Sequence, residues 1–298
     1  MRIFVTGASG WIGSAVVPEL LGSGHEVIGL ARSEASAARL TASGAQVHHG
    51  SLDDLEDLGR AASRCDGVLH LAFRHESDIE TALQGDRRAV EALGQALAGS
   101  DGPLVIASRL AGLPLGVLVT EDDVPHPGTP DGARSRAERR ALALAGHGVR
   151  AASVRLAPFV HGDGDGGYLP QLIGLARRRG AAGYLGDGTG CWPAVHRLDV
   201  ARLFRLAVEG APAGSVLHGF AEPGVPTRAV AEALGRGLGL PAVSVPVHHA
   251  HEHFGSLVDV CGLDRRASST RTRELLGWEP THPGLVEDLG GDHYFRVA

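Results

Sequence analysis

Short runs of apolar, often β-branched residues alternate along the chain with longer stretches in which apolar residues recur every three or four positions. The first pattern is typical of buried parallel strands and the second of amphipathic helices. Strands are expected at 1–6, 25–32, 46–49, 67–73, 104–108 and 149–156, and helices at 15–21, 34–43, 55–63, 78–98 and 130–146. This alternation predicts an α/β fold with a doubly wound parallel sheet, in which ligands bind at the carboxyl ends of the strands.

The first apolar run leads into a glycine turn, Gly7-Ala8-Ser9-Gly10-Trp11-Ile12-Gly13, and then into the first predicted helix. Gly7 allows a tight turn, Gly10 lets the backbone approach a diphosphate, and Gly13 lets the helix pack close to the strand. The amino end of the helix presents free N–H groups and a partial positive charge to an anion. Because a strand precedes the turn and a helix follows it, the sequence predicts a dinucleotide site here.

The glycines have the spacing G-x-x-G-x-x-G, and together with Thr6 they resemble the extended short-chain dehydrogenase/reductase family, also called the NAD-dependent epimerase/dehydratase family. Other segments over nearly the full length are similar to motifs of that family, namely 50–54, 67–73, 155–164, 186–201 and 272–278. The resemblance implies a dinucleotide-binding Rossmann domain at 1–157. It also implies a smaller C-terminal substrate-binding region at 158–298, of which 194–222 return to the Rossmann core.

The expected cofactor contacts follow the ends of the predicted strands. The second strand ends at Arg32, followed by Ser33, where an NAD enzyme has an acidic residue that binds the ribose 2′-hydroxyl. An arginine and a hydroxyl suit a 2′-phosphate, so NADP is expected, with NAD as the alternative cofactor. The resemblance implies further contacts from Gly7, Ser9, Gly10, Trp11, Ile12, Gly13, Ser51, Leu52, Leu71, Ala72, Phe73, Ser108, Arg136 and Pro158.

The proton-transfer motif of the family is altered in this chain. Residues 132–138 resemble the family's Y-x-x-S-K-A-E, but Gly132 stands in place of the catalytic tyrosine and Arg136 in place of the lysine. The chain contains no lysine at all. Glycine cannot transfer a proton, and the pKa of arginine is too high for a proton relay, although Arg136 can still bind the nicotinamide ribose.

Other residues are therefore considered for catalysis. By resemblance, Ser108 is expected to hydrogen-bond the substrate oxygen, and a capping serine is the alternative. His161 and Tyr168 are candidates for the missing proton donor, with a structural role as the alternative for the histidine. The substrate pocket is expected to include Tyr184, Trp192 and His196. Asp199 is expected to cap the helix that follows it.

Composition narrows the class of partner. A net charge of −6 and a pI near 6.2 do not indicate nucleic-acid binding. The longest apolar stretch, 104–119, is interrupted by arginine, glycine and proline, so no membrane span is expected. Three cysteines and a glycine turn close to Met1 favour a cytoplasmic location. The histidines within 248–253 lack H-E-x-x-H spacing, so no metal is expected.

Three classes of function remain. The preferred one is an NADP-dependent oxidoreductase acting on the carbonyl or alcohol of a small organic or natural-product substrate, because the cofactor itself carries the hydride chemistry. The others are a non-redox isomerase, dehydratase or cyclase on the same fold, and a non-catalytic NADP sensor. The pocket segments between 164 and 199 favour an enzyme. A homodimer through the helices at 78–98 and 130–146 is expected on the analogy with the family alone.

Overall fold

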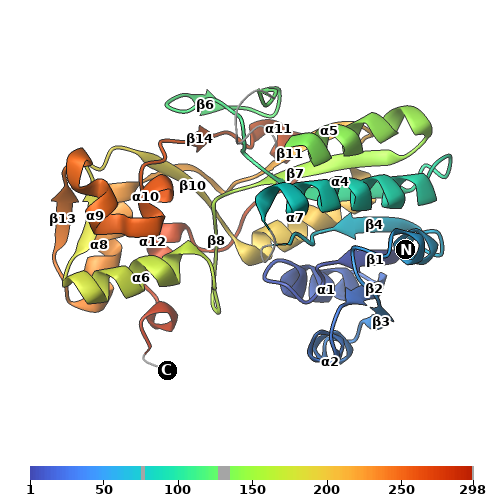
Figure 1. The fold of residues 1–298 in the computed structure, drawn as a ribbon, viewed down its shortest axis with the longest axis horizontal. Coiled ribbons are helices and arrows are strands. Elements are labelled where there is room, and N and C mark those ends of the chain that lie inside the picture. Colours follow the sequence, from blue (N-terminus) through green and yellow to red (C-terminus); the bar gives the residue numbers. More distant parts are fainter. Residues whose placement is uncertain (75–77, 127–134, 297–298) are drawn as a thin grey trace.

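The computed structural model describes residues 1–74, 78–126 and 135–296 (Figure 1). Its centre is a seven-stranded parallel sheet with the order β11-β7-β5-β4-β1-β2-β3. These strands are β1 (Arg2–Thr6), β2 (Glu26–Ala31), β3 (Gln46–His49), β4 (Gly67–His70), β5 (Pro103–Arg109), β7 (Arg150–Leu156) and β11 (Ser215–Gly219). The order confirms the predicted doubly wound fold. It reverses between β1 and β4, and ligands of such sheets bind at the carboxyl ends of the strands at this reversal.

Helices cover both faces of the sheet. They are α1 (Gly13–Gly22), α2 (Glu34–Ala42), α3 (Leu55–Ala62), α4 (Ile79–Ala96), α5 (Arg136–Ala143) and α7 (Arg197–Gly210). Successive side chains of a strand point to opposite faces, so Ile3 and Val5 pack with α1 and α7, whereas Phe4 packs with α3 and α4. The two hydrophobic cores therefore hold the sheet between two helical layers.

The C-terminal region lies at the other end of the molecule (Figure 1). It contains a three-stranded sheet and a two-stranded sheet with helices packed on them. Its elements are β8 (Phe159–His161), α6 (Tyr168–Arg179), β9 (Ala182–Leu185), β10 (Cys191–His196), β12 (Glu222–Pro226), α8 (Thr227–Leu238), β13 (Ala242–Val245), α9 (Ala250–Phe254), α10 (Val258–Cys261) and α12 (Leu285–Asp288). Between β10 and β12 the chain returns to the seven-stranded sheet as α7 and β11. The domain boundary at 157/158 stays a prediction.

Two short elements connect the regions. The strands β6 (Leu118–Val119) and β14 (Arg266–Ala267) pair in parallel, and α11 (Thr270–Leu276) follows β14 and packs beside β11. Within the described chain, no helix combines the length and apolar character needed to cross a lipid bilayer.

The start of α7 differs from the sequence prediction. His196 is the N-cap of this helix, and its ring Nδ1 accepts the Leu198 N–H at 3.3 Å. Asp199 lies inside the first turn, so the prediction that it caps the helix is wrong. Its buried carboxylate instead accepts the backbone N–H groups of Thr281 at 2.9 Å and His282 at 3.2 Å. Because the Asp199 carboxylate does not cap α7, it can hold the segment at 281–282, which is more than 80 positions further along the chain.

Candidate active site

The glycine turn between β1 and α1 is closed too tightly for side chains at two positions. Gly7 has a φ of +67°, and a Cβ there would lie 2.7 Å from the backbone nitrogen of Ala72. A Cβ at Gly13 would lie 2.1 Å from the carbonyl oxygen of Gly7. The Gly10 N–H donates to that same oxygen at 2.9 Å. The turn therefore requires glycine where it contacts the end of β4 and where α1 begins.

The amino end of α1 has unused hydrogen-bond donors. Ile12 is the N-cap, no side chain caps the helix, and its first turn contains no acidic residue. The N–H groups of Trp11 and Ile12 have no hydrogen-bond partner among the residues that the structure describes. Both residues are partly exposed. Donors of this kind at a helix N-terminus suit a phosphate group, so the turn fits the diphosphate of a dinucleotide.

A buried hydrogen-bonded chain fixes the floor of the turn. The Thr6 hydroxyl lies 2.8 Å from His70 Nδ1, and His70 Nε2 lies 3.0 Å from the Asp86 carboxylate. The Thr6 oxygen also accepts the Ala72 N–H at 3.3 Å. With His70 donating from Nε2 to Asp86, its Nδ1 accepts the Thr6 proton and leaves the Thr6 lone pairs for Ala72. Asp86 of α4 thus positions the end of β4 through two other side chains.

The residues expected at the adenosine end lie at the carboxyl edge of the sheet. Arg32 and Ser33 directly follow β2, and Ser33 caps α2 by accepting the Ser36 N–H at 3.3 Å. Ser51 accepts the Asp53 N–H at 3.2 Å in the loop after β3. The half-buried residues Leu52, Leu71, Ala72 and Phe73 lie on the same loop or just beyond β4. Their contacts with a cofactor stay predictions.

Ser108 lies near the end of β5 and is half-buried. Its hydroxyl has no hydrogen-bond partner within the described ranges. The register pairs Ser108 with Arg155 of β7, which in turn pairs with His218 of β11. Paired residues of adjacent parallel strands point to the same face, so Ser108 lies beside Arg155 and His218. Those two side chains are hydrogen-bonded within the protein, whereas the Ser108 hydroxyl is available to a ligand.

The neighbour of Ser108 belongs to a fully buried ion pair. Arg155 donates to the Glu138 carboxylate through Nη2 at 2.7 Å and Nε at 3.1 Å, and each side chain is only 2% exposed. Ser153 donates to the same carboxylate at 3.0 Å, and Arg155 Nη1 donates to the Asp123 carbonyl at 2.9 Å. The pair therefore joins α5 and β7 to the loop that follows β6. Sequence analysis assigned no role to it, although both residues stand within motifs that resemble the family.

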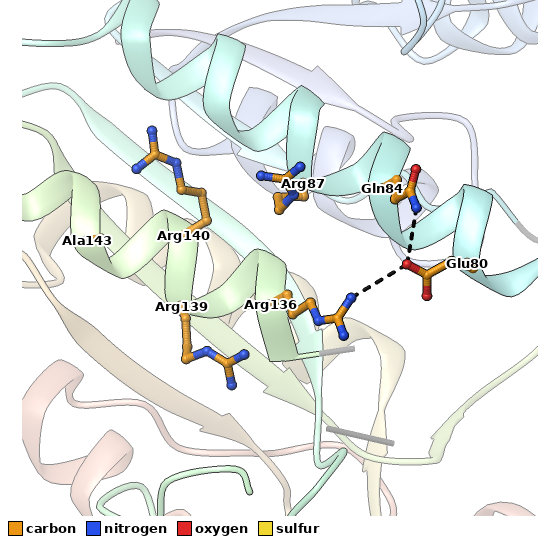
Figure 2. A pocket seen from close by; sticks show the side chains of 7 residues that line it. All are labelled: Glu80, Gln84, Arg87, Arg136, Arg139, Arg140 and Ala143. Atoms are coloured by element: carbon orange, nitrogen blue, oxygen red, sulfur yellow. Dashed lines mark hydrogen bonds and ion pairs between the residues drawn. The ribbon is translucent and has the colours of Figure 1, made fainter. Parts of the chain in front are cut away.

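Arg136 is not brought together with the glycine turn. It begins α5 and extends into the groove between α4 and α5, where Nη1 lies 3.5 Å from the Glu80 carboxylate (Figure 2). Within the described residues, no contact joins it to Ser108 or to residues 7–13. The predicted binding of the nicotinamide ribose by Arg136 thus has no support in this geometry. Gly132, at the position of the family's tyrosine, lies outside the described residues.

His161, a candidate proton donor, is fully buried. Its Nδ1 lies 2.7 Å from the Asp288 carboxylate, and its Nε2 is buried with no partner in the described parts of the chain. The ring of His196 lies edge-on at 5.5 Å, and burial, followed by the charges of His161 and His282, lowers the pKa of His196 to about 4. An imidazole without exposed surface cannot reach a substrate carbonyl, so the alternative structural role fits His161 better.

The aromatic residues expected in the substrate region pack within the C-terminal region. Trp192 is 3% exposed, stacks on Phe159 at 4.4 Å and donates its indole N–H to the Val260 carbonyl. Tyr168 begins α6 and lies 5.9 Å from the Phe159 ring. Tyr184 is half-buried, with Arg228 5.8 Å from its ring. Both the indole N–H and the ring face of Trp192 are thus occupied by the protein, and its place in the substrate pocket stays a prediction.

Trp11 connects the glycine turn to the C-terminal region. Its indole N–H donates to the Val160 carbonyl at 2.8 Å, close to the half-buried Pro158. The Arg197 guanidinium lies 4.1 Å from its ring centroid and donates to Ser14 at 3.1 Å. Sequence reasoning placed Trp11 only at the cofactor. The contact with β8 joins residues far apart in the chain and has no local sequence signal.

In the ranges that the structure describes, no three histidine, cysteine, aspartate or glutamate side chains are grouped so that they could hold a metal ion. Cys65, Cys191 and Cys261 are free thiols.

A parallel sheet with reversed strand order, a closed glycine turn and an uncapped helix N-terminus define a Rossmann-type dinucleotide-binding protein. The family model for the NAD dependent epimerase/dehydratase family matches residues 3–96. An uncharacterized protein of Schizosaccharomyces pombe is 46% identical over 99% of this chain and 100% of its own length. The chain belongs to the NAD-dependent epimerase/dehydratase family.

Two further relatives carry functional names. A ketoreductase of Stigmatella aurantiaca, specific by name for a farnesylated 3-oxo-dihydroquinoline oxide, is 30% identical over 72% of this chain and 67% of its own. The solved structure of MoeE5 in complex with UDP-glucuronic acid and NAD is 26% identical, covers 98% of each chain and superposes with a TM-score of 0.75. Proteins similar to this chain thus include a ketoreductase and a protein whose structure holds NAD and a nucleotide sugar.

Proposed function

We propose that this protein is an NADP-dependent oxidoreductase of the short-chain dehydrogenase type that interconverts a carbonyl and an alcohol on a small organic substrate. The observation that carries the proposal is the closed glycine turn, which leaves the Trp11 and Ile12 N–H groups free at the start of α1. The similarity to a ketoreductase over most of both chains supports the reaction class.

The residues have distinct roles in this proposal. The Trp11 and Ile12 N–H groups bind the diphosphate, and Arg32 with Ser33 binds the 2′-phosphate at the end of β2. When bound, the nicotinamide supplies or accepts the hydride. Ser108 donates a hydrogen bond to the substrate oxygen and stabilises the charge that develops there. Because His161 is buried and Tyr168 packs against Phe159 in the C-terminal region, we assign the proton to water in contact with the substrate oxygen.

Calorimetry with NADPH, NADP, NADH and NAD tests the cofactor assignment. We expect saturable binding with tighter binding of the 2′-phosphorylated pair, because a guanidinium pairs well with phosphate. The absence of heat and saturation with all four nucleotides would contradict the proposal.

NADPH oxidation against a panel of ketones and aldehydes tests the reaction. Ser108→Ala is expected to lower kcat about 10²- to 10³-fold, as loss of a donor to a developing oxyanion does, with a much smaller effect on nucleotide affinity. Ser63→Ala, which removes an exposed hydroxyl at the end of α3, is the matched control and should retain turnover. Tight NADPH binding without oxidation of any substrate would exclude the redox reaction. A conversion without change of mass would instead identify an isomerase.

A further inference from the structure

The segment that joins β8 to α6, residues 162–167, packs against the start of α1 although it belongs to the C-terminal region. Gly162 has a φ of +140°, and a Cβ there would lie 3.1 Å from Cγ of Arg197. A Cβ at Gly164 would lie 3.7 Å from the indole ring of Trp11. Figure 1 shows β8 between the seven-stranded sheet and the C-terminal helices. The 162–167 segment therefore contacts side chains that flank the proposed dinucleotide site.

Arg197, the first residue of α7, holds this segment and the start of α1 together. Its guanidinium lies 4.1 Å from the centroid of the Trp11 ring, and a cation is attracted to the face of an indole. Nη2 donates to the Ser14 hydroxyl at 3.1 Å, and Nη1 donates to the Asp163 carbonyl at 3.3 Å. The Arg197 side chain is only partly exposed, and its Nε is buried. One arginine thus contacts α1 with one nitrogen and the 162–167 segment with the other.

The backbone and the side chain of Trp11 face different parts of the molecule. Its backbone N–H is one of the two donors that the glycine turn offers to a diphosphate. Its side chain is held by Arg197 and by the Val160 carbonyl of β8, which accepts the indole N–H at 2.8 Å. A side chain that is fixed at two points restricts the backbone of its own residue. The direction of the Trp11 N–H therefore depends on contacts that lie outside the glycine turn.

The other side of the 162–167 segment is attached to the end of the chain. The Gly162 N–H donates to the Tyr294 hydroxyl at 2.9 Å, and the Asp165 N–H donates to the Gly162 carbonyl at 3.1 Å. Neither of these hydrogen bonds reaches α1. Among the described residues, Arg197 is the side chain that hydrogen-bonds both the segment and α1.

We propose that Arg197 is a positioning residue that couples dinucleotide binding to the ordering of the 162–167 segment. Arg197 holds Trp11 so that its N–H faces the diphosphate, and a bound diphosphate in turn keeps the segment against α1. Such coupling between two sites is reciprocal in free energy. The inference rests on the proposed dinucleotide site, but not on the reaction or on the choice between NADP and NAD. Because the segment leads into α6, the nucleotide orders this part of the C-terminal region before a substrate binds.

Titration calorimetry with whichever of NADP and NAD binds more tightly compares Arg197→Gln with Arg202→Gln. Arg202 is the matched control, because it is also a partly exposed arginine of α7 that donates to a backbone carbonyl at 3.3 Å, but that carbonyl belongs to Glu279. We expect the Kd to rise about tenfold in R197Q and to stay within about twofold of wild type in R202Q. Both variants should fold, because substitutions of partly exposed residues change stability little.

Hydrogen–deuterium exchange of residues 162–167 separates coupling from a merely structural role. In wild type and R202Q, saturating nucleotide should slow the exchange of this segment at least about threefold, because ordered backbone opens less often. In R197Q at saturation, the slowing should be lost although the nucleotide is bound. Trp11→Phe removes the indole N–H that binds Val160 and should lose part of the slowing, so it tests the coupling even if R197Q does not fold.

Weaker nucleotide binding in R197Q together with loss of the slowing supports the coupling, whether or not the proposed reaction is found. Slowing that persists in R197Q, an unchanged Kd, or equal weakening in R197Q and R202Q would overturn the inference and leave the proposed function in place. A wild-type protein that binds neither NADP nor NAD would contradict the proposed function itself and the coupling with it.

Discussion

Glu138→Gln should destabilise the protein strongly, although the substitution changes the shape of the side chain little. The Glu138 carboxylate accepts hydrogen bonds from Arg155 Nε and Nη2 and from Ser153, and both members of the ion pair are 2% exposed. The variant leaves the Arg155 charge buried without a counter-charge. An unpaired charge in a buried site is costly because water no longer solvates it.

The magnitude follows from this burial. Removing one partner of a buried ion pair costs about 3–5 kcal/mol in unfolding free energy. At roughly 2–3 °C per kcal/mol for a chain of this size, the midpoint of thermal unfolding should fall by roughly 6–15 °C. Arg155 also donates to the Asp123 carbonyl, so the loop that contains Asp123 should loosen first. Denaturant unfolding and limited proteolysis measure the two effects.

Glu91→Gln is the matched control for Glu138→Gln. It removes the same charge from an ion pair with arginine, but Glu91 and Arg140 are each 33% exposed. Exposed pairs contribute about 0–1 kcal/mol, so this variant should unfold close to wild type. The double variant Glu138→Met/Arg155→Met removes both charges and should lose less stability than Glu138→Gln. A loss below about 1 kcal/mol in Glu138→Gln, or equal losses in the two glutamine variants, would refute the reasoning.

Three further predictions concern the cofactor turn and the buried histidine. Thr6→Val removes the hydroxyl between His70 and Ala72 and should raise the Kd for nucleotide about tenfold by calorimetry, whereas Thr6→Ser should bind normally. Arg32→Ala should weaken NADP binding about tenfold and NAD binding hardly at all, and equal losses would exclude a 2′-phosphate contact. Burial raises the pKa of Asp288, but hydrogen bonding and charge interaction with His161, with help from His293 and His196, outweigh it and leave that pKa below the usual 3.8. The Asp288 carboxylate therefore stabilises the folded state at pH values above 3.8. This contribution is lost as the pH falls through the lower pKa that Asp288 has in the folded protein. Denaturant unfolding of Asp288→Asn should show its largest deficit at neutral pH and a smaller one near pH 3, and a constant deficit would disprove this account.

Much of the fold could be predicted from local sequence because it rests on periodicity. Alternation of apolar strands and amphipathic helices predicted the parallel sheet, and the spacing of Gly7, Gly10 and Gly13 predicted the turn that the close backbone contacts require. The loss of the family's tyrosine and lysine was also visible in the sequence, since it concerns residue identity alone.

The environment of individual side chains was decided by the tertiary structure. Arg136 occupies the position of a cofactor-binding lysine in the motif, yet its side chain lies in the α4–α5 groove. Trp192 was a candidate for the substrate pocket and His161 for the proton donor, but both are buried and hydrogen-bonded, to Val260 and Asp288 respectively.

The sequence by itself determined the order of strands and helices, the glycine turn and the absence of a tyrosine–lysine pair. Only the tertiary structure decided which polar groups remain free for a ligand, as at Trp11, Ile12 and Ser108, and which are used within the protein. The physical reason is distance along the chain. His161 and Asp288 are separated by 127 positions, so no local pattern of residues encodes their hydrogen bond, whereas the periodicity of a strand or a turn is complete within a few residues.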